Sequence, residues 1–202
     1  MQSLRTLLAA TLVGGAMLTL PMSQAVAEPT EATRAGATIV KLSPDFLKAL
    51  ATLKVAPGAI APGKLEVNSR GAKASFPITT GAVDLGTLKA EISHEGGLSL
   101  SAGKTRVELT SFIIDLAGDR PVLTGLVTVN DSLIGRVPLF DLNVSPRGVG
   151  GNEDYLKIND VGVTLTAEAA DALNSIFGVT AFTGGFPIGT AYVRAILEFE
   201  RH

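Results

Sequence analysis

The chain has 202 residues, of which 17 are basic, 19 are acidic and 46% are hydrophobic. This composition predicts a packed core rather than a disordered chain, and the net charge of -2 gives no electrostatic reason to expect a nucleic-acid partner. Because the chain contains no cysteine, disulfides, thiolate metal sites and a cysteine nucleophile are excluded.

Residues 1–27 have the pattern of a secretory signal peptide. Arg5 precedes an apolar run over residues 6–20, Pro21 ends that run, and Ala25 and Ala27 are small residues at the positions that signal peptidase reads. We therefore expect cleavage after Ala27 and a secreted or periplasmic protein of the cell envelope. The alternative is an uncleaved membrane anchor, but the run is shorter than the roughly 20 residues that span a bilayer.

Cleavage would leave residues 28–202, with 16 basic and 19 acidic residues. All three methionines lie before the cleavage site, so this mature chain would contain no sulfur and its stability must come from core packing. We expect residues 28–36, which are polar and rich in alanine, to form a flexible leader. Residues 37–202 are expected to form a single domain that does not span the membrane.

Apolar and polar residues alternate along much of the remaining chain, which predicts β-strands. Strand candidates lie at residues 98–102 and 107–114, with a Gly103-Lys104 turn between them, and at 122–129, 134–144, 155–158, 161–165 and 191–199. Turn residues recur about every 8 to 12 positions, a spacing typical of a sandwich or a barrel. We expect a mainly β fold, an antiparallel β-sandwich, with a long loop at residues 145–152.

Residues 42–53 and 165–176 follow a helical pattern instead. Ser43 and Thr166 are suited to cap the helix N-termini, and acidic residues follow each of them in the first turn, where the helix dipole favours negative charge. We expect two short helices that cap open ends of the sandwich. Because the two segments share this order of residues, an internal duplication is an alternative interpretation.

The sequence contains few residues and motifs that are suited to catalysis or metal binding. It contains no G-x-S-x-G, no H-x-x-x-H and no phosphate-binding glycine loop followed by a helix, and its two histidines are His94 and the C-terminal His202. We therefore expect no catalytic residue, no metal site and no enzymatic activity. A secreted hydrolase remains a third hypothesis, which rests only on the expected location and on generic carboxylates.

His94 is the most distinctive residue, because it lies in a Ser-His-Glu-Gly-Gly segment between two strand candidates. It can be interpreted as a solvated histidine in a turn. The alternative is a ligand contact at the mouth of the sandwich.

The order of segments around His94 is specific enough to compare with known domains. Residues 86–116 contain a strand, an S-H-E-G-G-L turn and a strand pair, and the helix that opens with L-T-A-E-A-A at residue 165 leads to G-F-P-I-G-T at residues 185–190. This order resembles the HtaA-type domain of secreted and surface-anchored bacterial haem-uptake proteins. The resemblance implies a β-sandwich with two short helices, a haem-like ligand, and ligand contacts from His94 and Phe186.

The sequence departs from that family at the position of the iron ligand. The resemblance implies a tyrosine near the N-terminus of the domain that binds haem iron, supported by the turn histidine. Residues 64–80 contain Phe76 but no tyrosine, the family's Trp-Gly opening is missing, and Tyr155 and Tyr192 do not align with a ligand position. A shared scaffold therefore does not by itself imply a shared ligand.

Two non-enzymatic functions remain open beside the hydrolase hypothesis. The first is a non-enzymatic, secreted module that binds a small apolar or haem-like ligand, or an envelope protein. The alternative is a structural or protein-interaction module of the cell envelope with no small-molecule site. A single pocket lined by both His94 and Phe186 would favour the first function, whereas a solvent-exposed His94 without an adjacent cavity would favour the second.

Overall fold

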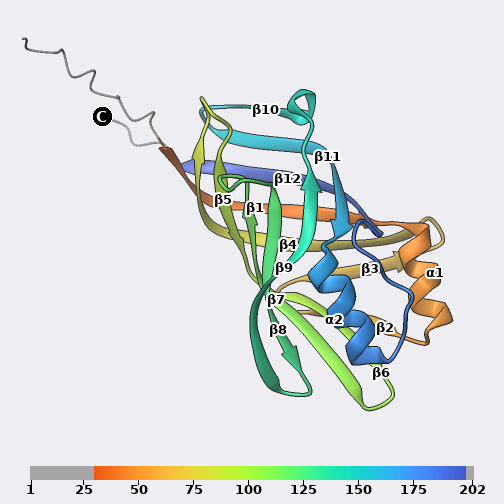
Figure 1. Cartoon of the computed structure of the whole chain (residues 1–202). Helices are drawn as coiled ribbons and strands as arrows, with labels where there is room; N and C mark the ends of the chain where they lie inside the picture. Colours follow the sequence, from red (N-terminus) through yellow and green to blue (C-terminus); the bar gives the residue numbers. More distant parts are fainter. Residues whose placement is uncertain (1–29, 199–202) are drawn as a thin grey trace, which may run out of the picture.

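A computed structural model describes residues 30–198 of the chain (Figure 1). The predicted signal peptide and its cleavage site, together with residues 199–202, lie outside the described residues. The described part contains two α-helices, α1 (Pro44–Thr52) and α2 (Ala167–Phe177), and one 3-10 turn, Pro146–Gly148. Its strands are β1 (Thr30–Leu42), β2 (Ala56–Ile60), β3 (Lys64–Asn68), β4 (Gly71–Asp84), β5 (Ala90–His94), β6 (Gly97–Ala102), β7 (Thr105–Asp115), β8 (Val122–Val129), β9 (Ser132–Asn143), β10 (Val149–Asn152), β11 (Tyr155–Leu165) and β12 (Pro187–Glu198).

Eight of these strands form a closed antiparallel barrel. Their order is β7-β5-β4-β1-β12-β11-β9-β8, and β8 pairs again with β7. The other strands extend the barrel: β6 pairs with β7, β2 with β6, β3 with β4, and β10 with β11. The predicted mainly β fold with two short helices is therefore confirmed, but a closed barrel with extra strands takes the place of the expected sandwich.

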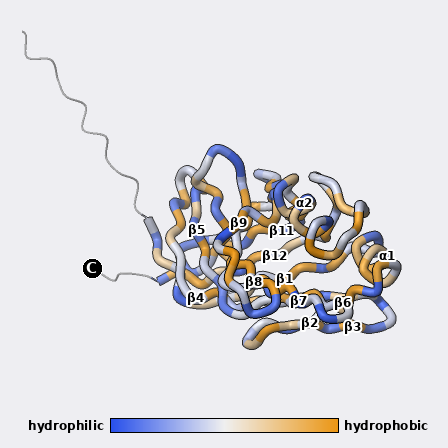
Figure 2. Tube along the Cα trace, turned by 60° about the horizontal axis from the view of Figure 1, so that its bottom comes forward, coloured by the Kyte–Doolittle hydropathy of each residue, from blue (hydrophilic) through white to orange (hydrophobic). Residues whose placement is uncertain are grey.

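Alternation of side chains between the two faces explains why these segments form strands. In β12, the buried residues are Ile188, Ala191, Val193, Ala195 and Leu197, while the residues between them face outward. Figure 2 shows the same alternation of hydrophobic and hydrophilic positions along other strands. The strands predicted from this pattern at residues 98–102, 107–114, 122–129 and 134–144 are confirmed as β6 to β9.

Three local predictions need correction. Residues 30–36, expected as part of a flexible leader, belong to β1 and pair with both β4 and β12. The alternation of apolar and polar residues did not reveal this part of β1, because its buried position is occupied by a polar residue, Thr33, and not by a large apolar one. The candidates at 155–158 and 161–165 form one strand, β11, with an irregularity between Ile158 and Val161, and the expected loop at 145–152 contains the 3-10 turn and β10.

Both helices begin at the same end of the barrel. β1 and β11 each run antiparallel to β12, and Leu42 and Val163 near their ends both pair with Gly189. The predicted N-caps are confirmed, because the Ser43 and Thr166 side chains accept hydrogen bonds from the amides of Phe46 and Ala169. Within residues 30–198, no helix is long and apolar enough to cross a membrane.

Candidate functional site

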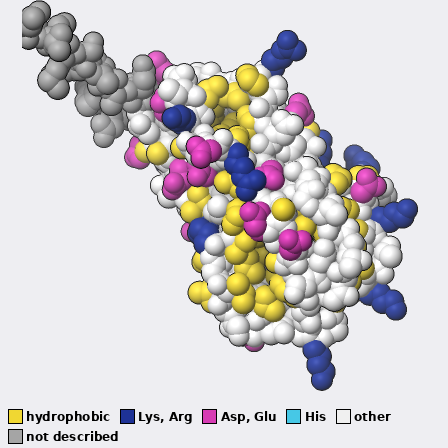
Figure 3. Space-filling model, viewed as in Figure 1, with side chains coloured by type: hydrophobic (Ala, Val, Ile, Leu, Met, Phe, Trp, Pro, Cys, Tyr) yellow, Lys and Arg dark blue, Asp and Glu magenta, His cyan; other side chains and the backbone are white. Residues whose placement is uncertain are grey.

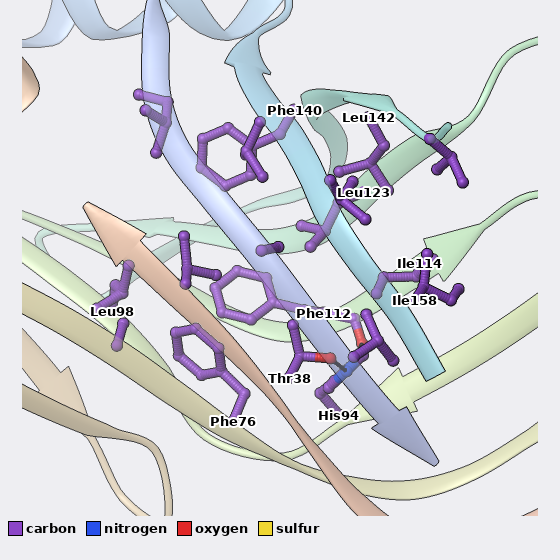
Figure 4. Close-up of a pocket in the computed structure, with 18 of the residues that line it drawn as sticks. Thr38, Phe76, His94, Leu98, Phe112, Ile114, Leu123, Phe140, Leu142 and Ile158 are labelled. Carbon is purple, nitrogen blue, oxygen red and sulfur yellow. Dashed lines mark hydrogen bonds between the residues drawn. The ribbon is translucent and has the colours of Figure 1, made fainter. Parts of the chain in front are cut away.

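His94 lies inside the barrel at the end of β5 and is only 5% exposed (Figure 4). Its Nε2 atom is 2.7 Å from Oγ1 of Thr38 on β1, and its Nδ1 atom is 3.3 Å from the carbonyl oxygen of Phe112 on β7. The histidine therefore links two strands that lie on different sides of β4 and β5. It is neither a solvated turn residue nor a residue at the mouth of the fold.

The hydrogen-bond partners of His94 determine its tautomer, and its burial determines its charge. A carbonyl oxygen can only accept a hydrogen bond, so Nδ1 carries the proton and donates to Phe112. In the neutral ring Nε2 then accepts from the Thr38 hydroxyl. Burial disfavours the charged form and lowers the pKa of His94 from 6.5 to about 4, so the ring is uncharged at neutral pH.

The cavity next to His94 is small and apolar. Its volume is about 50 Å³, and the rings of Phe76 and Phe112 meet edge to face within it, with centroids 5.0 Å apart. Cavities that take drug-sized ligands measure about 300–1,000 Å³, and an eight-stranded barrel is just wide enough for side chains to fill. The interior around His94 is therefore a packed core and does not have room for a porphyrin.

Phe186, the second predicted site residue, lies elsewhere. It precedes β12, packs edge to face on Phe182 with ring centroids 5.4 Å apart, and lines a separate hollow beside α1. His94 and Phe186 do not line the same cavity. Whether either residue contacts a ligand stays a prediction.

A larger apolar groove, of about 380 Å³, lies beside the barrel. One wall is the part of the sheet that extends beyond the barrel, with alternating residues of β6, β7, β8 and β9 facing the groove. The opposite wall is α2, which presents a stripe at helical spacing: Ala169, Ala172, Leu173 and Ile176. Figure 3 shows hydrophobic side chains open to solvent over the lower part of the molecule, where Figure 1 draws β8 and β9 beside α2.

The base of this groove adjoins the barrel interior. Leu42, Leu98, Phe140 and Ile188 line both the groove and the cavity next to His94. They form a single layer of side chains between the two spaces. This layer separates His94 from the groove, and His94 does not line the groove.

The segment after His94 connects β5, a strand of the barrel, to β6, a strand of the groove wall. Gly96 has a φ of +77°, and a Cβ atom there would lie 2.2 Å from the amide nitrogen of Gly63. A Cβ atom on Gly97 would lie 2.1 Å from the carbonyl oxygen of Leu109. The Gly-Gly pair thus permits the corner through which β5 passes into β6.

Among the residues that the structure describes, no side chain that lines the groove could ligate iron or ionise. Its lining is aliphatic except for Phe46, Phe140, Pro57 and Ser175. The nearest charges on its helical wall are acidic, Glu168 and Asp171, both exposed. Among residues 30–198, no group of three or more histidine and acidic side chains could hold a metal ion.

The rim of the groove is formed in part by the β8–β9 hairpin. Ile134 lines the groove and is 62% exposed, while its neighbour Leu133 is 66% exposed and does not line it. The pairing of β8 with β9 shifts at this point, from Thr128–Leu133 to Val127–Gly135. Ile134 is the extra residue of this bulge, and bulges redirect side chains.

Sequence reasoning did not identify this groove. The alternating residues of β6 to β9 and the stripe on α2 were visible, but such patterns ordinarily mark surfaces buried in a core. The sequence could not show that these strands continue past the barrel. Because they do, their apolar face and the apolar stripe of α2 lie opposite each other on the two sides of the groove.

Comparisons with solved structures show the same fold in proteins of very different sequence. The C-terminal domain of HtaA from Corynebacterium glutamicum superposes with a TM-score of 0.65 at 15% identity, covering 83% of this chain and 99% of that domain. The heme binding protein HtaB from the same organism superposes with a TM-score of 0.56 at 9% identity, covering 84% of this chain and 96% of that protein. The predicted resemblance to the HtaA-type domain is therefore confirmed for the fold.

A domain-swapped dimer of a histidine-to-alanine variant of the same HtaA domain also matches, with a TM-score of 0.54 at 16% identity over 76% of this chain and 91% of that one. No protein-family model matches the sequence. No curated protein matches it significantly.

Proposed function

We propose that this protein is a non-enzymatic, exported module that binds an apolar, haem-like small molecule in the groove between α2 and strands β6 to β9. The observation that carries the proposal is a solvent-accessible groove of about 380 Å³ whose lining contains no charged side chain. Ligand pockets have volumes of this order and are lined mainly by hydrophobic side chains. A scaffold shared with a heme binding protein, HtaB, supports the same ligand class.

Haem fits this groove only in part. The apolar walls suit the faces of a porphyrin, but the lining has no tyrosine, histidine, methionine, lysine or cysteine that could bind the iron. The acidic residues of α2 would also repel the propionate groups of haem. We therefore expect the ligand to be held by apolar contact, with no contribution from iron coordination by the groove.

His94 and Phe186 have indirect roles in this proposal. His94 keeps β1 and β7 in place under the layer of residues that forms the base of the groove. Phe186 packs on Phe182, whose backbone amide and carbonyl are both hydrogen-bonded to the side chain of Asn174 on α2. Both residues are thus positioning residues for the two walls.

The test is a titration of the purified protein with haemin and, in parallel, with iron-free protoporphyrin IX, followed by absorbance and fluorescence. We expect one saturable site for each, with affinities that agree within about tenfold, since iron contributes nothing to binding. Replacing Ile134 by glutamate removes an apolar contact and places a negative charge at the rim of the groove, where it would repel the propionate groups of either porphyrin. This variant should weaken both affinities by at least about tenfold.

Leu133→Glu is the matched control, because it adds the same charge to the neighbouring exposed residue, which does not line the groove. This variant should bind like the wild type. Failure of the wild type to bind either porphyrin would contradict the proposal and favour the alternative, a structural or protein-interaction module. Equal loss in the two variants would show that the ligand does not occupy the groove.

A further inference from the structure

The outer surface of the barrel across β1, β12 and β11 carries a second distinctive group of side chains. On β12 the residues between the buried ones face outward, and these include Tyr192 and Arg194. The pairing register places Arg194 beside Lys157 of β11, and Tyr192 beside Ile39 of β1. We refer to Lys41, Tyr155, Lys157, Tyr192 and Arg194 as the basic face.

Aromatic rings, rather than carboxylates, hold the cations of the basic face. The Nζ atom of Lys41 is 5.0 Å from the centroid of the Tyr192 ring. The Tyr155 ring has Lys157 Nζ at 4.9 Å and the guanidinium of Arg194 at 5.4 Å. In the described part of the chain none of these three cations forms an ion pair. Cation–π contacts orient a charge without neutralising it.

The whole chain has a net charge of -2, so the basic face is distinguished by the arrangement of its cations and not by net charge. The three strands carry four basic residues, Arg34, Lys41, Lys157 and Arg194, and three carboxylates, Glu31, Asp160 and Glu198, and the turn before Tyr155 adds Glu153 and Asp154. Glu198 lies four residues beyond Arg194, about 13 Å along the strand. Because none of the three cations of the basic face forms an ion pair among the described residues, their charges can attract a partner of the opposite sign.

The shape of the face restricts the class of partner. A shallow hollow of about 310 Å³ lies on this face, and the residues that line it include the small Gly36 and Ala37 together with Lys157, Tyr192 and Arg194. A flat bilayer cannot follow such a hollow, whereas a narrow chain can. The strands beneath, β1 and β12, are paired on both sides, so their backbone offers no edge to which a peptide strand could add.

We propose that the basic face binds an anionic polysaccharide. Its negative groups would pair with Lys41, Lys157 and Arg194, and its hydroxyls would hydrogen-bond to the tyrosine hydroxyls. Lys41 and Lys157 are separated by β12 and lie on different rows of the sheet, because Lys41 is opposite Thr190 and Lys157 is opposite Arg194. An extended polymer that crosses the strands diagonally reaches both.

The test uses immobilised dextran sulfate, with neutral dextran as the uncharged reference. The wild-type protein should bind dextran sulfate and not dextran, and binding should weaken as the salt concentration rises. The triple variant Lys41→Glu, Lys157→Glu, Arg194→Glu should bind at least about tenfold more weakly. Circular dichroism and thermal melting would establish that this variant is folded.

A control variant, Lys48→Glu, Lys54→Glu, Lys89→Glu, changes the net charge by the same amount at exposed residues away from the basic face. It should bind dextran sulfate at least tenfold more tightly than the basic-face variant does. Equal weakening in the two variants would overturn the proposal, because binding would then follow net charge alone. Tighter binding of the wild type to polyglutamate or to phosphatidylglycerol vesicles than to dextran sulfate would also overturn it.

Discussion

His94 contributes to stability only in its neutral form, because both of its ring nitrogens are committed inside the barrel. Nδ1 donates to the Phe112 carbonyl and Nε2 accepts from the Thr38 hydroxyl. A proton on Nε2 would turn this acceptor into a donor in a site with no carboxylate partner. The folded-state pKa of about 4 therefore lies below the value of 6.5 expected for the unfolded chain.

The first prediction concerns the pH dependence of stability. Above pH 6.5 the ring is neutral in both states, and as the pH falls toward 4 only the unfolded chain takes up a proton. The wild type should therefore lose about 2 kcal/mol of unfolding free energy between pH 7 and pH 5 relative to His94→Gln. Urea denaturation of both proteins at the two pH values measures this difference, in which the contributions of the carboxylates cancel.

Parallel pH dependence of the two proteins would contradict the assignment of His94 as a neutral core residue. Should His94→Gln fail to fold, Thr38→Val provides a second measurement, since it keeps the shape of the buried side chain and removes only the hydroxyl. We expect this substitution to cost about 1–3 kcal/mol, because it leaves Nε2 without a partner.

At the scale of single residues, the sequence singled out His94 but could not place it. Its prominence came from being the one histidine away from the C-terminus. Burial depends on Thr38, Phe76 and Phe112, which lie far from His94 in the sequence and are brought to it only by the barrel.

At the scale of elements, α2 forms one wall of the groove and is attached to the barrel through its first residue. The Thr166 hydroxyl accepts a hydrogen bond from the amide of Ala169 and donates one to the Pro138 carbonyl on β9. Thr166 is fully buried, whereas Ser43, which caps α1, is partly exposed. The two N-caps thus perform the same local role in different surroundings.

The second prediction compares these two caps. Thr166→Ala should lower the free energy of unfolding by about 2 kcal/mol, because it removes the cap and leaves the partly buried carbonyl of Pro138 without its donor. Ser43→Ala should cost about 1 kcal/mol. Urea denaturation measures both, and Thr166→Ala should also weaken porphyrin binding more than Ser43→Ala does. Equal effects on stability and binding would contradict the role of Thr166 in holding the groove wall.

Elements with large alternating side chains were predictable, and those with small ones were not. The strands from β6 to β9 follow Leu, Val and Ile at every second position, and both helices carry recognisable caps. The first part of β1 uses Ala, Thr and Gly instead, and β2 contains Pro57 and Gly58. Their strand conformation is imposed by pairing with neighbours, which local sequence does not reveal.

At the scale of the whole molecule, the barrel depends on each strand being paired on both sides. β12 lies between β1 and β11 and supplies buried residues along its whole length. Sandwiches and barrels share the same alternation of residues, so the closure of the sheet by β7 and β8 could not be read from the sequence. The groove follows from that closure, since it lies where the long strands continue past the barrel.

The third prediction tests this closure. Deleting residues 190–202 removes most of β12 and should abolish cooperative unfolding. β1 and β11 would each lose the partner strand that lies between them, and the barrel would be left open. Deleting only residues 199–202 removes none of the described pairing and should leave a cooperative transition. Differential scanning calorimetry of both truncations measures this, and a cooperative melt of the longer deletion near the wild-type temperature would contradict the topology.

A methyl NMR titration of the isotope-labelled protein with protoporphyrin IX, which is diamagnetic, would locate the bound ligand residue by residue. We expect the methyl resonances of Ile134, Leu173 and Ile176, which line the groove, to shift in proportion to occupancy. Those of Ile92 and Ile114, buried in the barrel, should move little. Shifts confined to the barrel interior or to another surface, or none at any ligand concentration, would contradict the assignment of the groove as the binding site.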